Sequence, residues 1–109
     1  LMPFAVWLTD DAARDLAGIV DYMARHYGAA EASRVLQGIE KALATLEESP
    51  ERGSYAKELL ALGIKQYREL LFKPYRLIYS VDEADVFVVV VADSRCDFRA
   101  LLERRLLEG

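Results

Sequence analysis

Cysteine is nearly absent from this chain. Cys96 is the single cysteine among 109 residues, so no disulfide can form within the chain. A reducing cytoplasm is the simplest setting for such a protein, and we expect a cytoplasmic location. The same count also fits a secreted protein that has no disulfides.

Long apolar segments are missing too. No apolar run approaches the roughly 20 residues that a helix needs to span a bilayer. The N-terminus also lacks a basic region followed by an apolar core, so we expect neither a secretory signal nor a membrane partner. Leu1 stands before Met2 as a processing or cloning scar would, and we expect the natural chain to start at Met2.

The common short signatures of catalysis and cofactor binding are absent. The sequence has no glycine-rich phosphate loop, no Gly-x-Ser-x-Gly elbow and no paired Cys or His spacing for zinc. His26, the only histidine, lies near the end of a predicted helix and is expected at the surface. Cys96 has an arginine neighbour but no evident histidine base, so a catalytic thiol is not expected. We interpret the acids Asp82, Glu83 and Asp85 as a solvated turn, and therefore expect no metal and no cofactor.

Net positive charge is lacking. The formal charge is −4 and the isoelectric point is near 5.0. This excludes the class of proteins that bind nucleic acid over their whole surface, because those are basic. The charge is uneven, however: Lys65, Arg68, Lys73 and Arg76 against Glu69 leave three net positive charges between residues 65 and 79. The sequence therefore allows a local basic face on an acidic body.

An apolar content of 53% is present, which is ample for one small globular domain. Phe4–Leu8 is short and apolar and predicts an opening strand. Thr9 has the character of a helix N-cap, and Gly28 that of a helix stop. A second amphipathic helix follows and ends at Ser49-Pro50, with Gly38 expected to pack closely against a neighbour. Two such helices with a short link predict an antiparallel hairpin that covers one side of a sheet.

Three strands are predicted after an irregular segment, in which Tyr55 to Leu62 form a short helical turn. The strands are expected over residues 64–71, 75–81 and 86–92. Val86–Val91 is β-branched and aromatic and apolar on both faces, so it is expected to be a central strand covered on each side. A last helix begins near Phe98, capped by Asp97 or Asp93. The sequence therefore predicts a single α+β domain over residues 1–109: an N-terminal strand, an antiparallel two-helix hairpin, a three-stranded antiparallel meander and a C-terminal helix.

Arginines on the meander are the main candidates for function. Arg68 and Arg76 lie eight residues apart across a tight turn, so their side chains are expected to approach on one face. Arg95 follows the third strand, and guanidinium groups so placed match carboxylates or phosphates with paired hydrogen bonds. In the alternative interpretation they pair with nearby acids: Glu69, Asp93 or Asp97. Such pairs would simply hold the sheet and the last helix together, and the residues alone leave both interpretations open.

Three motifs, in this order, resemble the RelE/ParE toxin superfamily of type II toxin–antitoxin systems: Tyr67-Arg68-Glu69-Leu70, Pro74-Tyr75-Arg76-Leu77-Ile78-Tyr79 and Arg95-x-Asp97-Phe98-Arg99-x-Leu101-Leu102-x-Arg104-Arg105-Leu106. Each motif is short and degenerate, but with the order of elements the set covers nearly the whole chain. The long helix hairpin and the Arg-x-Asp-Phe-Arg start of the last helix are more similar to the ParE branch, the plasmid-stabilisation toxins, than to the RelE branch.

The resemblance implies two different activities for the two branches. RelE-type toxins are ribosome-dependent mRNA endoribonucleases that use basic residues on the sheet and a tyrosine in the last helix. Arg68, Arg76 and Arg95 occupy positions that are basic in that branch, but Leu70 replaces a further basic residue and the last helix has no tyrosine. We therefore expect a ParE-like toxin that inhibits DNA gyrase and growth without catalysis of its own. The alternatives are a RelE-like ribonuclease and a non-toxic antitoxin-binding module.

The resemblance also implies a partner. A ParD-like antitoxin binds operator DNA with its N-terminal half and folds its C-terminal segment onto the toxin, so we expect a hetero-oligomer that contacts DNA only indirectly. The helix hairpin and the sheet edge are the expected docking surfaces, and Arg68, Arg76 and Arg95 are expected to receive acidic residues of the antitoxin. The candidate target- or antitoxin-binding residues are Arg68, Tyr75, Arg76, Arg95 and Arg99.

Overall fold

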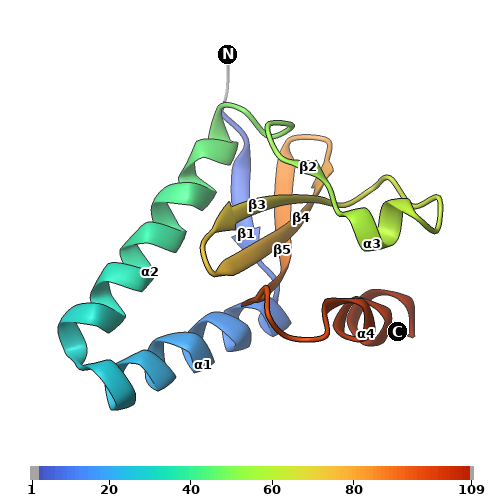
Figure 1. Cartoon of the computed structure of the whole chain (residues 1–109). Helices are drawn as coiled ribbons and strands as arrows, with labels where there is room; N and C mark the ends of the chain where they lie inside the picture. The colour runs from blue at the N-terminus through green and yellow to red at the C-terminus, as the bar shows by residue number, and fades with distance from the viewer. Residues whose placement is uncertain (1–2, 109) are drawn as a thin grey trace.

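A five-stranded sheet separates two sets of helices in the computed structural model of the chain, which describes residues 3–108 (Figure 1). The predicted start at Met2 lies outside the described residues. The elements, in order, are β1 (Ala5–Leu8), α1 (Asp10–Tyr27), α2 (Ala29–Ala44), the 3₁₀ turn η1 (Thr45–Glu47), β2 (Ser54–Tyr55), α3 (Lys57–Leu60), β3 (Arg68–Phe72), β4 (Tyr75–Asp82), β5 (Asp85–Asp93), α4 (Phe98–Leu102) and the π-helical turn η2 (Glu103–Leu107). No helix within residues 3–108 has the length and apolar character to cross a membrane. The predicted α+β class and order of elements are confirmed.

The helix hairpin begins and turns where Thr9 and Gly28 predict, but its second helix is shorter than predicted: α2 ends at Ala44, and the 3₁₀ turn η1 continues only to Glu47, before Ser49-Pro50. The Thr9 hydroxyl accepts a hydrogen bond from the Ala12 N–H at 3.2 Å at the start of α1. Gly28 joins the two helices with a φ of 94°, a conformation that glycine adopts without steric cost. From Gly28 the helices diverge as a V along one side of the sheet (Figure 1). A Cβ on Gly38 would overlap the ring of Phe72 on β3, which confirms the predicted close packing of α2 at this position.

The sheet has the strand order β1-β5-β4-β3-β2, with β1 parallel to β5 and the other pairs antiparallel. β5 therefore lies between two strands, as its apolar run predicts. An irregularity opposite Ile78 and Tyr79 shifts the register along β5. Because of this shift, Val86, Val88 and Val91 all face the same side.

Two hydrophobic cores cover the two faces of the sheet. The first joins α1 and α2 to Leu77 and Tyr79 of β4 and to the three valines just described. The second joins α3 and α4, through Leu59, Phe98 and Leu102, to Ile78 of β4 and Val90 of β5. The predicted burial of β5 on both faces is confirmed.

The segment before the meander differs from the prediction in two respects. Ser54–Tyr55 forms the short strand β2 beside β3, where only a turn was expected. β3 begins at Arg68 and not at Ile64, because the preceding residues bond to α3 and its flank: the Ile64 N–H donates to the Leu59 carbonyl and the Tyr67 carbonyl accepts from Ala56. α3 lies within the predicted helical turn, and Asp97 caps α4 by accepting from the Ala100 N–H at 3.1 Å.

Candidate functional site

Arg76 lies at the centre of a buried ion triad. It is 6% exposed, and its guanidinium donates to both carboxylate oxygens of Glu58 on α3 at 2.7 Å each. It also donates to Glu69 of β3, from Nε at 2.8 Å, and its Cζ lies 4.0 Å from the centre of the Phe98 ring on α4. The hydrogen bonds with Glu58 raise the pKa of Arg76, and the same contact lowers the pKa of Glu58. Arg76 thus joins the sheet to α3 and α4. This agrees with the alternative interpretation of the sequence, in which the arginines pair with nearby acids and hold the sheet and the last helix together.

Arg68 and Arg76 lie on opposite faces of the sheet, so the prediction that they approach each other was wrong. Arg68 is opposite Tyr79 across the β3–β4 pair, and directly opposed residues share a face. Tyr79 and Arg76 are three positions apart on β4, and an odd spacing along a strand places side chains on opposite faces. The short distance along the chain did not reveal the register of β3 and β4, which decides the face on which each side chain lies.

Arg68 supports the short strand β2. Its Nη1 donates to the Gly53 carbonyl at 2.8 Å, and its guanidinium carbon lies 4.4 Å from the centre of the Tyr55 ring. The Tyr79 hydroxyl accepts from the Gly53 N–H at 3.0 Å, which fixes the same loop. The remaining surface of Arg68 lines a polar hollow of about 480 Å³ together with Lys65.

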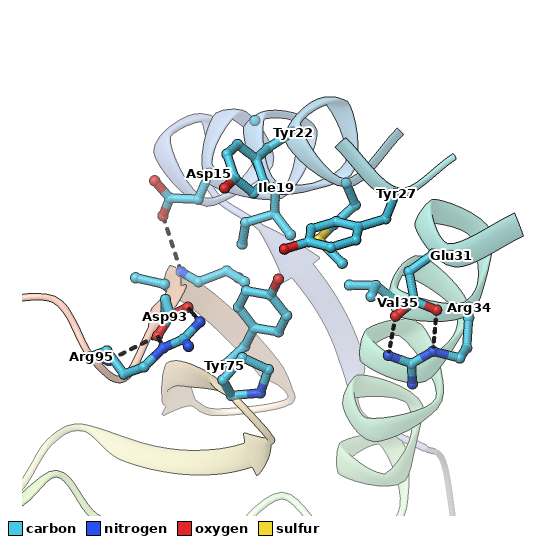
Figure 2. Close-up of a pocket in the computed structure, with 15 residues that line it drawn as sticks. Asp15, Ile19, Tyr22, Tyr27, Glu31, Arg34, Val35, Tyr75, Asp93 and Arg95 are labelled. Carbon is cyan, nitrogen blue, oxygen red and sulfur yellow. Dashed lines mark hydrogen bonds and ion pairs between the residues drawn. The ribbon is translucent and has the colours of Figure 1, made fainter. Parts of the chain in front are cut away.

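Tyr75 and Arg95 line a larger opening, here called the helix–sheet cleft. It has a volume of about 700 Å³ and lies between α1, α2 and the ends of β4 and β5 (Figure 2). The polar side chains that line it are Asp15, Tyr22, Tyr27, Glu31, Arg34, Tyr75, Asp93 and Arg95. Burial, followed by the charge of Asp93, raises the pKa of the Tyr75 hydroxyl.

Ion pairs stand at two edges of the helix–sheet cleft. Arg95 donates from Nε to Asp93 at 2.9 Å, and Arg34 donates from Nε to Glu31 at 2.7 Å (Figure 2). These bonds lower the pKa values of Asp93 and Glu31. Both carboxylates are therefore ionised at neutral pH.

The remaining candidates are exposed. Arg99 on α4 points into solvent, with Nε 3.3 Å from Glu103, and remains accessible to a partner. Cys96 is exposed, and desolvation together with the charge of Asp93 raises the pKa of its thiol, which disfavours the reactive thiolate. His26 is exposed in the last turn of α1, where its ring stacks on Tyr22 with 4.2 Å between centroids. No group of three or more His, Cys, Asp or Glu side chains in residues 3–108 is arranged to hold a metal ion.

Sequence reasoning missed a second set of polar contacts, between α1 and the C-terminal turn. Both carboxylate oxygens of Asp15 accept from Arg105 at 3.0 Å, and Asp15 also accepts from the Val91 N–H at 3.0 Å. Arg105 donates in addition to the Val89 carbonyl at 2.9 Å. Asp15 and Arg105 are 90 residues apart, and nothing in either local pattern indicates the other. Glu58 was missed for the same reason, because only the fold brings α3 to Arg76.

A family model described as "ParE toxin of type II toxin-antitoxin system, parDE" matches residues 6–98. The chain belongs to the ParE toxin family. The chain is therefore the toxin component of a type II toxin–antitoxin system, within the RelE/ParE superfamily that its motifs resemble. The comparison with curated proteins gave no match.

Solved structures of ParE and RelE toxins share this fold. The chromosomal ParDE toxin–antitoxin system from P. aeruginosa contains a chain that superposes with a TM-score of 0.69 at 18% identity, covering 83% of this chain and 95% of that one. A chain of the toxin–antitoxin complex RelBE2 from Mycobacterium tuberculosis gives 0.60 at 24% identity, covering 85% and 93%. A double arginine-to-alanine variant of the E. coli toxin RelE in the free state gives 0.63 at 21% identity, covering 97% and 100%. At these identities the likeness shows the fold alone.

Proposed function

We propose that this ParE-family protein acts in the cytoplasm by inhibiting DNA gyrase, without catalysis of its own, and that a cognate ParD-like antitoxin neutralises it. Family membership supports the role of toxin. The choice of gyrase over mRNA rests on the arrangement of the arginines.

The observation that carries this proposal is that Arg76 is not available to bind a phosphate. A ribonuclease of the RelE type would need free basic groups that converge on one phosphate. Here Arg76 is buried and already bonded to two carboxylates, so a phosphate brought to it would meet the negative charges of Glu58 and Glu69. Arg68 lies on the opposite face of the sheet, and Arg95 is bonded to Asp93. The three arginines thus form no common anion site.

Supercoiling by purified gyrase, measured with increasing amounts of this protein, tests the proposal. We expect inhibition that is relieved when the protein is premixed with the product of the neighbouring gene. Unaffected gyrase would contradict the proposal. Mapping of mRNA ends with translating ribosomes then tests the ribonuclease alternative, and growth of cells that express the protein distinguishes both toxins from a non-toxic binding module.

We place the antitoxin in an apolar groove that α1 forms with the end of β1 and with α2. Leu8, Leu16, Val20 and Leu36 line this groove, whose volume is about 560 Å³. The rest of its wall comes from α1: the small residues Ala13, Ala17 and Ala24, and Asp21. Small side chains allow a second backbone to come close, as the apolar face of an amphipathic antitoxin helix would.

A matched pair of variants tests this docking site. Ala17→Glu puts a carboxylate into the groove, and we expect it to weaken binding of the neighbouring-gene product by about tenfold or more, because the charge would be buried in an apolar contact. Ala30→Glu makes the same change on an exposed position of α2 outside the groove and should leave affinity unchanged. Equal affinities for the two variants, measured by calorimetry, would contradict the assignment of the groove.

A further inference from the structure

β1 is the first strand of the sheet order, so it has a neighbour on one side only. Natural proteins protect such edge strands with charged side chains, prolines or bulges, because an open edge pairs with other chains. β1 has none of these devices: it consists of Ala5, Val6, Trp7 and Leu8. Trp7 is 54% exposed and Leu8 is 38% exposed. The edge of the sheet at β1 is therefore both apolar and accessible.

The backbone groups of Val6 and Leu8 face this open edge. The N–H groups of Ala5 and Thr9 donate to carbonyls on or beside β5, at 3.1 and 3.0 Å. Alternate residues of a strand bond to the same neighbour, so the residues between them point their N–H and C=O groups away from β5. Within residues 3–108, no hydrogen bond from the N–H of Val6 or Leu8 crosses to another element on that side.

Phe4 limits how a second strand can pair with β1. Its N–H also points away from β5, but it already donates to the Glu47 carbonyl of η1 at 2.8 Å. Val6 and Leu8 are therefore the two residues of β1 that can accept a new neighbour. An antiparallel copy of β1 uses the free groups of both residues in one register, in which Val6 lies opposite Leu8 of the copy.

We propose that β1 pairs in this register with β1 of a second copy of the chain, which joins the two sheets around a two-fold axis. Each copy supplies two donors and two acceptors, so the pairing forms four backbone hydrogen bonds. The row of free groups is self-complementary, which makes a second copy of the chain a matching partner.

Trp7 lies at the centre of the proposed interface. In this register it faces Trp7 of the second copy in a non-hydrogen-bonded pair, with about 4.5 Å between the Cα atoms, so the two indoles cover each other. The indole Nε1 donates to Asp85 at 3.0 Å, which holds the ring beside Phe87 on the same face of the sheet. Aromatic pairs of this kind add to the attraction between strands.

The distribution of charge favours β1 as the contact between copies. The chain carries a net charge of −4, so its acidic surfaces repel a second copy, whereas β1 contributes no charge to the contact. Asp10 and Asp11 follow β1, but the antiparallel register places them at opposite ends of the interface from their counterparts. The proposal does not depend on gyrase being the target or on the antitoxin groove, although Leu8 also lines that groove.

Sedimentation of the isolated protein over a range of concentrations tests the proposal. An interface of this small size predicts a dissociation constant of about 10–100 µM. The average mass should rise from about that of one chain toward that of two. Trp7 is the only tryptophan, so its fluorescence should shift to shorter wavelengths over the same range as the ring is covered. A mass of one chain at about 1 mM, tenfold above that range, would overturn the proposal.

Amide hydrogen exchange of the unmodified protein locates the contact. The N–H groups of Val6 and Leu8 should exchange about threefold or more slowly at about 500 µM than at about 5 µM, because pairing protects them. Protection at other residues only would overturn the proposal. Protection of these two groups only after the neighbouring-gene product is added would assign the edge to the antitoxin, and would overturn it too.

Opposite charges at position 7 test the two-fold register. Trp7→Lys and Trp7→Glu should each weaken self-association by about tenfold or more, because like charges then face each other across the axis. An equimolar mixture of the two variants should associate again, because opposite charges then meet. Tyr27→Lys replaces another exposed aromatic residue, 65% exposed, away from β1 and should associate like the wild type.

Wild-type association of both Trp7 variants, or a mixture that associates no better than its components, would overturn the proposal. Circular dichroism of each variant verifies that it is folded. The sedimentation measurement contains neither gyrase nor antitoxin, so its failure would leave the proposed function standing.

Discussion

The guanidinium of Arg76 keeps two carboxylates, those of Glu58 and Glu69, bonded in a place where water has little access. Their side chains are 16% and 14% exposed, and that of Arg76 is 7% exposed. A buried triad of this kind contributes little net stability compared with apolar side chains, yet losing one member is costly because the others remain as unpaired charges. We therefore interpret the triad chiefly as a device that fixes how α3 and α4 sit on the sheet.

Removing the guanidinium of Arg76 tests whether the loss of one member of the triad is as costly as we expect. We expect Arg76→Ala to lower the free energy of unfolding by about 3–5 kcal/mol, because Glu58 and Glu69 lose their shared partner. Urea denaturation at neutral pH measures the effect. The exposed Arg99→Ala should change it by less than about 0.5 kcal/mol. If the triple variant Arg76→Met with Glu58→Leu and Glu69→Leu were no more stable than Arg76→Ala, this account of the triad would be wrong.

Glu58 should also give the protein an acid-sensitive contact. Its pKa is lowered in the folded state by the hydrogen bonds from Arg76, so its stabilising contribution is fully present above the unfolded value of about 4.3. That contribution is lost as the pH falls through the lower folded value. The free energy of unfolding, measured from pH 6 downward, should therefore decrease below about pH 4.3, and less steeply in Glu58→Gln. An identical slope in the variant would contradict the prediction.

Whether a contact of a single residue could be predicted depended on how far apart its two partners lie along the chain. The sequence allowed Arg76 to pair with Glu69 or Arg95 with Asp93, because these acids are close along the chain or on a neighbouring strand. Whether each arginine was paired or free depended on register and burial, which local pattern does not give. Glu58 could not be predicted, because α3 carries no periodic signal that indicates which face of the sheet it covers.

At the scale of elements, the helices were predicted best because their ends are marked chemically. Thr9 and Gly28 satisfy terminal backbone groups in ways that few other residues can. The valine run likewise indicated the central strand. By contrast, β2 has only two residues, and their pairing with β3 is fixed by contacts of Gly53 and Arg68 that depend on the finished fold.

Two glycines within the helices should respond in opposite ways to the same change. A Cβ on Gly18 of α1 meets nothing within 4 Å, so Gly18→Ala should stabilise the protein by about 0.5–1 kcal/mol through its helix propensity. Gly38→Ala places a Cβ where the Phe72 ring lies, and should cost about 1–3 kcal/mol. Thermal unfolding of both variants measures the difference, and adding Phe72→Leu should recover part of the loss. Stabilisation by Gly38→Ala would contradict the packing described here.

At the scale of the whole molecule, β1 and the C-terminal turn η2 both contact β5. β1 pairs with it in parallel, and Arg105 of the C-terminal turn bonds to its backbone and to Asp15 of α1. Local sequence patterns predicted the order of elements, but they do not give contacts across 80 or 90 residues. The parallel partner of β1 and the Asp15–Arg105 pair were consequently found only in the structure.

The contact between Arg105 and Asp15 can be tested by comparing a variant of Arg105 with a variant of the neighbouring Arg104. Arg105→Ala should detach the C-terminal turn, so amide hydrogen exchange over residues 98–107 should become about tenfold faster, with little change in α2. Arg104 is exposed, and Arg104→Ala removes the same charge without this contact. Equal exchange in the two variants would show that apolar contacts alone hold the turn.

The pairing of β1 with β5 also determines when the sheet can be completed during synthesis. During synthesis β1 is made before β5, so this parallel pair forms only after Asp85–Asp93 has been made. The contacts of longest range in the sheet therefore form late. A chain whose synthesis has not reached β5 therefore carries no finished sheet, and it also lacks the helix–sheet cleft, which β5 helps to line.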